Sequence, residues 1–338
     1  MSVPSLLLKA DPHECGTLPL ISIVVPTFNR AGWLSEALES LTCQRTDGRF
    51  SYEVIVVDNA STDATREVVE GFASAAPVRY IHQDKPGDAP TRNQGVAAAG
   101  GQWIAFFDDD ELAKEDWLLE LYTAATKAGA FIVGGAVHLH LTEEQSFQLG
   151  PICRGALREL KPYRDMRPYS GKLMPGCGNA IVAREVFDRI GSFDTTLVNG
   201  GSDTDFFLRA RTAGYMPWYT PKAVILHRVP PSRLSVEYFR WDALQGGDNI
   251  ATHDFRRSSR ARMVLLSIAR AGQAALVHLP LLIRGWMRRT PGAVLGRKTR
   301  LWRAEGYLRK TLALLAPRAF PQSKFFKSLE FRSGRTFG

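Results

Sequence analysis

Four apolar residues run directly into four carboxylates at Ile104–Glu111 of this chain. The apolar half is typical of a buried strand, and in open α/β sheets ligands bind at the carboxyl ends of strands. Adjacent carboxylates repel one another, so such a cluster is costly unless a cation neutralises it. Hard divalent cations prefer oxygen ligands and are commonly shared between carboxylates and a substrate's phosphates. Taken by itself, the cluster is equally compatible with a solvated turn or the first turn of a helix.

Two other apolar segments end in polar residues in the same way. Leu20–Pro26 stops before a loop that contains Asn29, and Tyr52–Val57 stops at Asp58. Helical spacing of apolar residues separates the segments, so strands and helices alternate as in a parallel α/β sheet. The carboxyl ends of parallel strands meet at one edge of the sheet. We therefore expect Asn29, Asp58 and the acidic cluster to gather in one crevice.

Missing motifs exclude several classes of protein. No GxGxxG follows the first strand and no GxxxxGK[ST] occurs in the sequence, which argues against a dinucleotide-dependent oxidoreductase and against a P-loop enzyme. The four cysteines lie far apart without a CxxC pair, which argues against zinc and indicates reduced thiols of a cytoplasmic protein. The residues before Pro19 lack a signal-peptide pattern, so no export is expected.

Positive charge is concentrated at the end of the chain. Residues 1–255 hold 24 Lys and Arg against 32 Asp and Glu, whereas residues 256–338 hold 19 against two. The apolar stretch within residues 263–283 is interrupted by Arg270 and Pro280, and a spanning helix needs about 20 uninterrupted apolar residues. Basic flanks around such a segment favour a helix lying on an anionic membrane surface. The alternative is a helical subdomain packed on the main domain. High apolar content without a reading motif argues against nucleic acid.

These patterns predict three regions. Residues 1–18 are expected to be a flexible leader, residues 19–250 an α/β domain, and residues 251–338 a basic, partly amphipathic helical region. Within the α/β domain, residues 142–173 are expected to be irregular because they are rich in charge, proline and aromatic residues.

The chain resembles the family 2 glycosyltransferases over about residues 20–249. The resemblance rests on six motifs in order: Pro26–Arg30, Val56–Asp63, Ala89–Gly95, Phe106–Asp110, Gly201–Asp205 and His227. It implies an α/β, Rossmann-like GT-A fold, with a mostly parallel sheet flanked by helices and here a basic helical C-terminal extension. It also implies metal-assisted, inverting transfer from a nucleotide-diphosphate sugar, with a UDP-sugar as the expected donor.

The resemblance further implies a role for individual residues. Binding of the nucleotide sugar is implied for Pro26, Thr27, Asn29, Asp58, Arg92, Asn93, Asp108 and Asp109. Asp110 and His227 would hold Mn²⁺ or Mg²⁺, and Asp203 would be the general base. The chemistry agrees, because a leaving diphosphate gathers negative charge that a divalent metal stabilises. An acceptor hydroxyl needs a carboxylate base, and a base opposite the leaving group gives inversion.

Two departures from the family pattern concern the acceptor. Ser202 stands where the family usually has Glu before the base, which bears on hydrogen bonding to the acceptor. The segment Glu237–Trp241 is close to the Gln-x-x-Arg-Trp of processive members but begins with an acid. We therefore expect single addition to a hydroxyl of a glycan or lipid-linked acceptor. The expected location is the cytoplasm, with peripheral attachment to the cytoplasmic face of the membrane.

Two other functions are compatible with this type of fold. A sugar nucleotidylyltransferase would need a Gly-rich, Arg-containing loop directly after the first strand, and Pro26–Arg30 is not such a loop. A non-catalytic nucleotide-binding protein is the second alternative. The presence of Asp108, Asp110, Asp203 and His227 together argues against it.

Overall fold

The structure is a computed structural model of the chain. It describes residues 18–320 except 75, 86, 172 and 198–200. The predicted flexible leader, apart from Leu18, lies outside the described residues.

The chain divides into two compact units. The first comprises Met1–His138 and Leu160–Arg228, and the second Leu139–Glu159 and Val229–Gly338. The predicted boundary at residues 250 and 251 falls inside the continuous helix α9 (Val236–Arg257), so the division differs from the one expected. That expectation followed the change of charge, whereas the chain leaves the first unit earlier, where its last strand ends.

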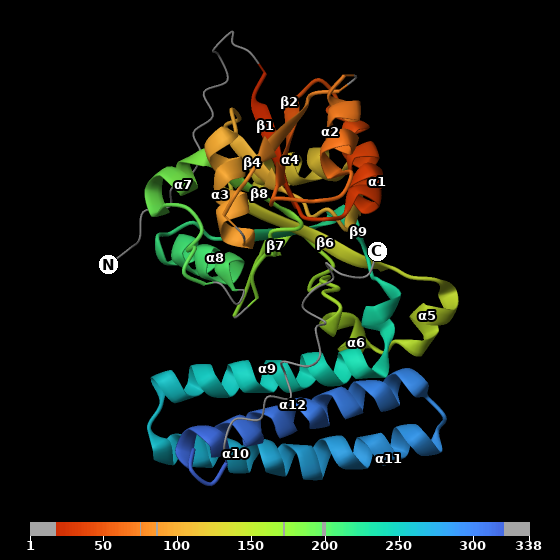
Figure 1. Cartoon of the computed structure of the whole chain (residues 1–338), viewed down its shortest axis with the longest axis vertical. Helices are drawn as coiled ribbons and strands as arrows, with labels where there is room; N and C mark the ends of the chain where they lie inside the picture. The colour runs from red at the N-terminus through yellow and green to blue at the C-terminus, as the bar shows by residue number, and fades with distance from the viewer. Residues whose placement is uncertain (1–17, 75, 86, 172, 198–200, 321–338) are drawn as a thin grey trace. The chain divides into compact units, whose positions relative to one another are not determined.

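The first half of the sheet in the first unit is parallel (Figure 1). Its strands lie in the order β3-β2-β1-β4. Their bounds are β1 (Leu20–Thr27), β2 (Ser51–Asp58), β3 (Val78–His82) and β4 (Trp103–Phe106). The helices between them are α1 (Ala31–Thr42), α2 (Thr65–Ala73) and α3 (Asp88–Ala98). This arrangement confirms the predicted α/β fold with a sheet flanked by helices.

Local sequence explains these elements. Strand β1 has fully buried Ile21, Ile23, Val24 and Val25 in near-continuous order, as expected for a strand covered on both faces. Helix α1 instead buries apolar residues at intervals of three and four, so one stripe of the helix faces the core. Strands with two covered faces therefore alternate with amphipathic helices.

The order of the strands places a crevice at one edge of the sheet. The chain proceeds from β1 outward to β2 and β3, then returns to add β4 on the other side of β1. Loops that leave β1 and β4 at their carboxyl ends therefore diverge, which is where ligands bind in such sheets. Thr27 at the end of β1 pairs with Asp58 at the end of β2. Pro26 is tolerated in this central strand because the pairing with β4 stops at Val24.

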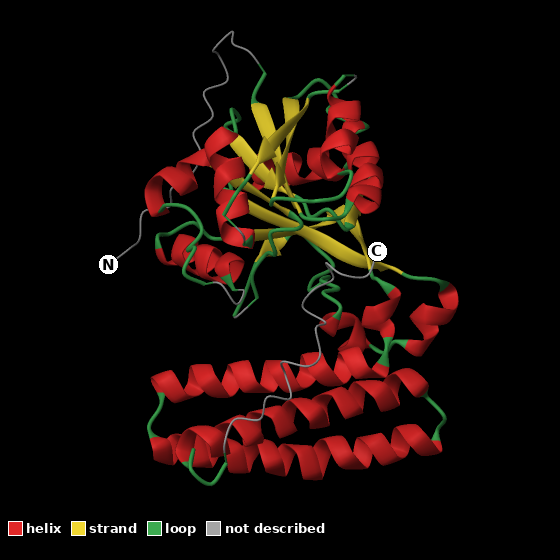
Figure 2. Cartoon of the chain, viewed as in Figure 1, coloured by secondary structure: helices red, strands yellow, loops and turns green. Residues whose placement is uncertain are grey.

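The recorded pairings in the other half of the sheet are antiparallel (Figure 2). Its order from β4 is β8-β6-β9-β5, and β7 pairs with β9. The strands are β5 (Glu111–Ala113), β6 (Ile132–His140), β7 (Arg167–Pro168), β8 (Ala180–Ala183) and β9 (Trp218–Arg228). The helices are α4 (Trp117–Ala128), α7 (Arg184–Ile190) and α8 (Ser202–Thr212). The prediction of a mostly parallel sheet is therefore wrong for this half, because apolar composition predicts a strand but not its direction.

Gly95 sets the distance between α3 and the sheet. A Cβ at this position would lie 2.3 Å from Val24 Cγ1 and 3.2 Å from Val57 Cγ2. We expect Gly95→Ala to lower the free energy of unfolding by about 2 kcal/mol, because the added methyl overpacks a rigid interface. Urea denaturation of Gly95→Ala and of Gly71→Ala measures this. Gly71 in α2 has open space around its Cβ position, so Gly71→Ala is expected to be neutral or slightly stabilising. Equal destabilisation by both variants would contradict this packing role.

The second unit is helical and contains the basic region. Its elements are α5 (Glu143–Gln148), α6 (Pro151–Ala156), η1 (Pro231–Leu234), α9, α10 (Arg260–Gln273), η2 (Ala274–His278), α11 (Leu279–Met287) and α12 (Pro291–Leu315). Helix α12 runs along α9 (Figure 1), where a Cβ on Gly306 would lie 2.2 Å from the Leu244 carbonyl oxygen. The predicted irregular segment 142–173 is wrong in part, because it contains α5 and α6. A capping box between Thr142 and Gln145 starts α5, a local signal that the sequence carries.

Candidate active site

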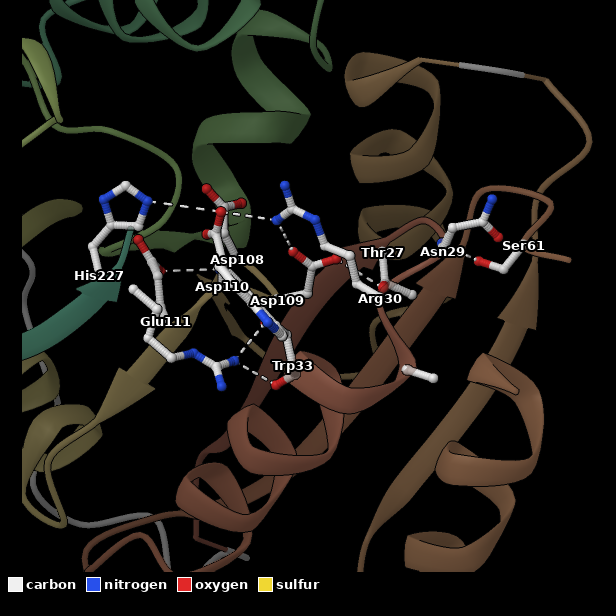
Figure 3. A network of polar contacts seen from close by, with 12 residues as sticks. Thr27, Asn29, Arg30, Trp33, Ser61, Asp108, Asp109, Asp110, Glu111 and His227 are labelled. Atoms are coloured by element: carbon white, nitrogen blue, oxygen red, sulfur yellow. Dashed lines mark hydrogen bonds and ion pairs between the residues drawn. The ribbon is translucent and has the colours of Figure 1, made fainter. Parts of the chain in front are cut away.

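Carboxylates from the loop after β4 meet a single arginine from the loop after β1 (Figure 3). Arg30 Nη1 donates to Asp109 Oδ1 at 2.7 Å and to Asp110 Oδ2 at 2.8 Å. Thr27 Oγ1 donates to the other oxygen of Asp109, Oδ2, at 2.8 Å. The loops that follow β1 and β4 are therefore joined by a network of charged hydrogen bonds.

Burial and charge act differently on the two neighbouring acids. Burial raises the pKa of Asp109, with the charge of Asp110 acting in the same direction and Arg30 opposing it. Burial also works against ionisation of Asp110. There, however, the contact with His227, whose Nε2 lies 3.7 Å from Asp110 Oδ2, and the charge of Arg30 outweigh burial and lower the pKa of Asp110. The pKa of Asp110 therefore lies below that of its neighbour Asp109.

His227 and Glu111 reach the cluster because their strands are neighbours. They are paired residues of β9 and β5, and His227 Nε2 lies 3.7 Å from Asp110 Oδ2. Glu111 Oε2 accepts from the backbone N–H of Asp108 at 3.1 Å. Burial, together with the charges of Asp108 and Asp110, raises the pKa of Glu111 well above its usual value. A Cβ at Gly178 would lie 2.3 Å from this carboxylate, so Gly178 allows the backbone to approach Glu111.

Arg92 contacts the acidic loop, and the charge of the predicted base acts on it. Its Nη2 donates to Asp108 Oδ1 at 3.1 Å, and its buried Nε has no hydrogen-bond partner among the described residues. Burial opposes the charge of Arg92, but Asp108, Asp88 and Asp203 raise the pKa of Arg92. Asp203 lies half-buried in the first turn of α8. The charges of Asp108 and Asp203, both predicted site residues, therefore act on the same Arg92 guanidinium.

The ends of β1 and β2 form the side expected to hold the nucleotide. Asp58 is 2% exposed and accepts from the backbone N–H of Ser61 at 2.9 Å and from the Tyr80 hydroxyl at 2.7 Å. Burial and this hydrogen bond raise the pKa of Tyr80 to about 12, so its phenol remains a donor. Asn29 has a positive φ of 50° and accepts from the backbone N–H of Thr62 at 2.7 Å. The loops after β1 and β2 are therefore joined directly.

The structure gives Asn93 different partners from the predicted nucleotide sugar. Its Nδ2 donates to the carbonyl oxygen of Phe193 and its Oδ1 accepts from the Phe193 N–H, both at 2.9 Å. The two residues are 100 positions apart, so no local pattern reveals the contact. Asn93 fastens α3 to the segment after α7, and we assign it a structural role.

The contacts of two arginines identify them as further functional candidates. Arg30 was part of a quoted motif, but only its contacts identify it as the neutralising cation. Arg228 donates through Nη2 to the carbonyl oxygens of Trp33 and Asp109 and pairs with Glu36 at 2.9 Å. Its guanidinium also lies 4.9 Å from the centre of the Trp33 ring. A basic residue directly after His227 was the signal available in the sequence. Arg228 holds the backbone that carries the acids.

The side chains at this site that could bind a divalent cation are carboxylates and His227. In the described parts of the chain, no three His, Cys, Asp or Glu side chains form a ready-made metal cluster. Asp110 Oδ2 and His227 Nε2, at 3.7 Å, are spaced so that one ion can contact both. Mg²⁺ and Mn²⁺ are commonly held by one or two protein groups together with substrate phosphates and water. Asp110 and His227 therefore fit such an ion as a pair of protein ligands completed by the substrate. Asp110 Oδ2 also accepts from Arg30 Nη1 at 2.8 Å, so Arg30 would have to release that oxygen when the ion binds.

Comparisons with known proteins identify the family of the chain. The family model described as Glycosyl transferase family 2 matches residues 22–191, about half of the chain. Glycosyltransferase AglE of Haloferax volcanii is 28% identical over 217 residues, 64% of this chain and 69% of that protein. The succinoglycan biosynthesis protein ExoM of Rhizobium meliloti is 31% identical over 225 residues, 64% of this chain and 70% of that protein.

Solved structures with the same fold are more distant in sequence. Mannosyltransferase PcManGT from Pyrobaculum calidifontis, solved with GDP-Man and Mn²⁺, has a TM-score of 0.51 at 20% identity. The match covers 94% of this chain and 80% of that one. S. aureus TarS has a TM-score of 0.51 at 18% identity, with 87% of this chain and 55% of that one covered. On the family model, the relatives and the shared fold, the chain belongs to glycosyl transferase family 2 and is a glycosyltransferase of the GT-A type.

Proposed function

We propose that the protein transfers one sugar from a nucleoside diphosphate sugar to a hydroxyl of a glycan or lipid-linked acceptor, with inversion at the anomeric carbon. The observation that carries the proposal is the convergence at one strand-order reversal of Asp58, the Arg92–Asp108 pair and the Asp110–His227 pair. These groups suit, in that order, a base, a sugar or diphosphate, and a cation. The solved relatives support a nucleotide sugar as the donor, because PcManGT was solved with GDP-Man and TarS with UDP.

Each part of the donor has a suitable group in the first unit. Asp58 keeps carboxylate lone pairs that can accept from an N–H of a base, which favours a uracil-type nucleotide. Arg92 has an unused Nε donor for the sugar or diphosphate. Thr27 and Asp109 are already bonded to each other, so we assign them to shaping the pocket rather than to its strongest contacts.

Asp110 and His227 are proposed to hold Mn²⁺ or Mg²⁺. Such an ion, when bound, stabilises the negative charge that develops on the leaving diphosphate. Arg30 contributes positive charge at the same carboxylates in this structure and keeps Asp109 and Asp110 close together. We propose that Arg30 orients Asp110 for the ion.

Asp203 is proposed to take the proton from the acceptor hydroxyl. Its Oδ1 accepts from the backbone N–H of Thr204 at 2.7 Å, and Oδ2 has no hydrogen bond to another described residue. Asp203 belongs to α8, whereas Asp108 and Asp110 belong to the loop after β4, so the proposed base and the groups at the leaving diphosphate come from different segments. This supports displacement with inversion.

Single addition is favoured by the environment of the segment after η1. Trp241 is packed in an apolar cluster of the second unit with Leu139, Cys153 and Phe239, while Glu237 and Arg240 are exposed. Trp241 therefore contributes to the packing of the second unit, which favours single addition over processive transfer. The cytoplasmic location stays a prediction from the sequence.

A thermal-shift screen of nucleotide sugars with and without Mn²⁺ tests the proposal. A donor at about 100 times its Kd is expected to stabilise the protein by about 2.7 kcal/mol, because it binds only the folded state. The same nucleoside monophosphate should stabilise less, since it lacks the diphosphate. Absence of a shift with any UDP- or GDP-sugar in either condition would refute the donor class. Equal shifts in Mn²⁺ and in chelator would refute the metal.

A further inference from the structure

An apolar stripe runs along one side of the continuous helix formed by α10, η2 and α11. This 28-residue helix is, among the described residues, the one whose length and composition would allow it to cross a membrane. Its stripe consists of exposed side chains three or four residues apart, with Gly272 between the second and third: Leu265, Ile268, Leu276, Leu279, Ile283 and Trp286. Trp286 is 74% exposed and Leu276 80% exposed. Such a stripe is normally covered.

The opposite side of the helix packs against other residues of the second unit. Met263 is fully buried in a cluster with Ala251 and Tyr307. The Arg270 guanidinium lies 4.1 Å from the centre of the Tyr307 ring and 3.5 Å from Asp254 Oδ2. Helices α10 and α11 are therefore held against α9 and α12 by buried contacts, and the apolar stripe is the side that points away from them.

Positive charges border the apolar stripe without acidic partners. Five exposed arginines lie near the two ends of the helix: Arg260, Arg262, Arg284, Arg288 and Arg289. None of the five forms an ion pair with another described residue, whereas Arg303 and Lys310 of α12 pair with Asp242 and Asp248 of α9. Among the described residues, these five arginines are thus exposed and without an ion pair, whereas Arg303 and Lys310 are neutralised by α9.

We propose that the apolar stripe lies flat in the interface of an anionic lipid bilayer, with these five arginines at the level of the lipid phosphates. Two copies joined through the stripe would bring like charges together, and an uncharged apolar partner would leave the arginines unneutralised. A bilayer supplies acyl chains for the stripe and negative charge for its borders. Trp286 suits the boundary between them. We infer that the helix lies in the plane of the interface and does not span the bilayer, because Arg270 in its first half contacts Asp254 and Tyr307 inside the second unit. This inference goes beyond the transfer reaction and does not depend on it.

The charge requirement is tested by flotation of the full chain with vesicles. Vesicles of phosphatidylcholine alone are compared with vesicles that also contain phosphatidylglycerol. Arg288→Gln with Arg289→Gln is expected to weaken binding to the anionic vesicles about 30-fold. The matched control, Lys127→Gln with Arg189→Gln, removes two exposed charges from the first unit and should bind as the wild type does. Equal binding of wild type to neutral and anionic vesicles, or no binding to either, would overturn the proposal.

The apolar requirement and the orientation are tested on the same vesicles. Trp286→Ser is expected to bind about tenfold more weakly, whereas Phe147→Ser, which alters a side chain 79% exposed on α5, should bind normally. Alkaline carbonate should release the wild type, and protein that stays bound would indicate a spanning helix instead. A dimer in lipid-free sedimentation that Trp286→Ser dissociates would identify a second copy as the occupant. Donor binding in lipid-free solution is measured in parallel, so failure of the catalytic proposal is recognised separately.

Discussion

Replacing Asp110 by Asn is expected to reduce sugar transfer by about 10³-fold. This corresponds to about 4 kcal/mol of transition-state stabilisation. Asp110 is the carboxylate whose pKa is lowered by His227 and Arg30 despite burial. An amide keeps the shape of the side chain but not its charge, so it holds a divalent ion poorly. Transfer rates over a range of Mn²⁺ concentrations, with calorimetry of Mn²⁺ binding, measure the loss.

The matched control is Asp188→Asn, which removes an exposed carboxylate of α7. This control should transfer at the wild-type rate. The Asp110→Asn protein should remain folded, because Arg30 keeps its ion pair with Asp109 at 2.7 Å. Its melting temperature checks that point. Transfer by Asp110→Asn within tenfold of the wild type, with unchanged Mn²⁺ affinity, would show that the cation is held elsewhere.

Replacing Asp203 by Asn should leave donor binding intact and reduce transfer by about 10²–10⁴-fold, the range typical of a lost general base. Asp203 touches neither Asp58 nor the Asp110–His227 pair in the recorded hydrogen bonds, so the Kd for the nucleotide is expected to change little. The chemical step is affected because the amide cannot accept the proton of the acceptor hydroxyl. Calorimetry with donor and a discontinuous transfer assay separate the two quantities.

Asp205→Asn provides a control two residues further along the same helix. Asp205 pairs with Arg209 at 2.8 Å, an exposed i,i+4 contact of small expected energy. This variant tests whether a charge change in α8 alone disturbs transfer. If Asp205→Asn and Asp203→Asn reduce transfer equally, or if Asp203→Asn transfers normally, the base lies elsewhere.

Some predictions from the sequence are confirmed because they depend only on residues close together in the chain. The continuous apolar runs of β1 and β2 indicate strands that are buried on both faces. The spaced apolar residues of α1 indicate a helix that is buried on one face. The order of the motifs then placed Asn29, Asp58 and the acidic loop at neighbouring strand ends. Domain division was less accessible, since a change of charge at residue 256 does not mark where the chain leaves the sheet.

The sequence by itself determined the family, the parallel half of the sheet and the identity of the acidic residues. Each of these depends on motifs or apolar patterns whose residues are close together in the chain. Only the tertiary structure decided which groups meet those acids: Arg30 at Asp109 and Asp110, His227 through the pairing of β5 with β9, and Phe193 at Asn93. It also decided which arginines of the basic region are neutralised by α9 and which remain at the surface. Such contacts join residues far apart in sequence, and their formation depends on strand direction and helix rotation, which local composition leaves open.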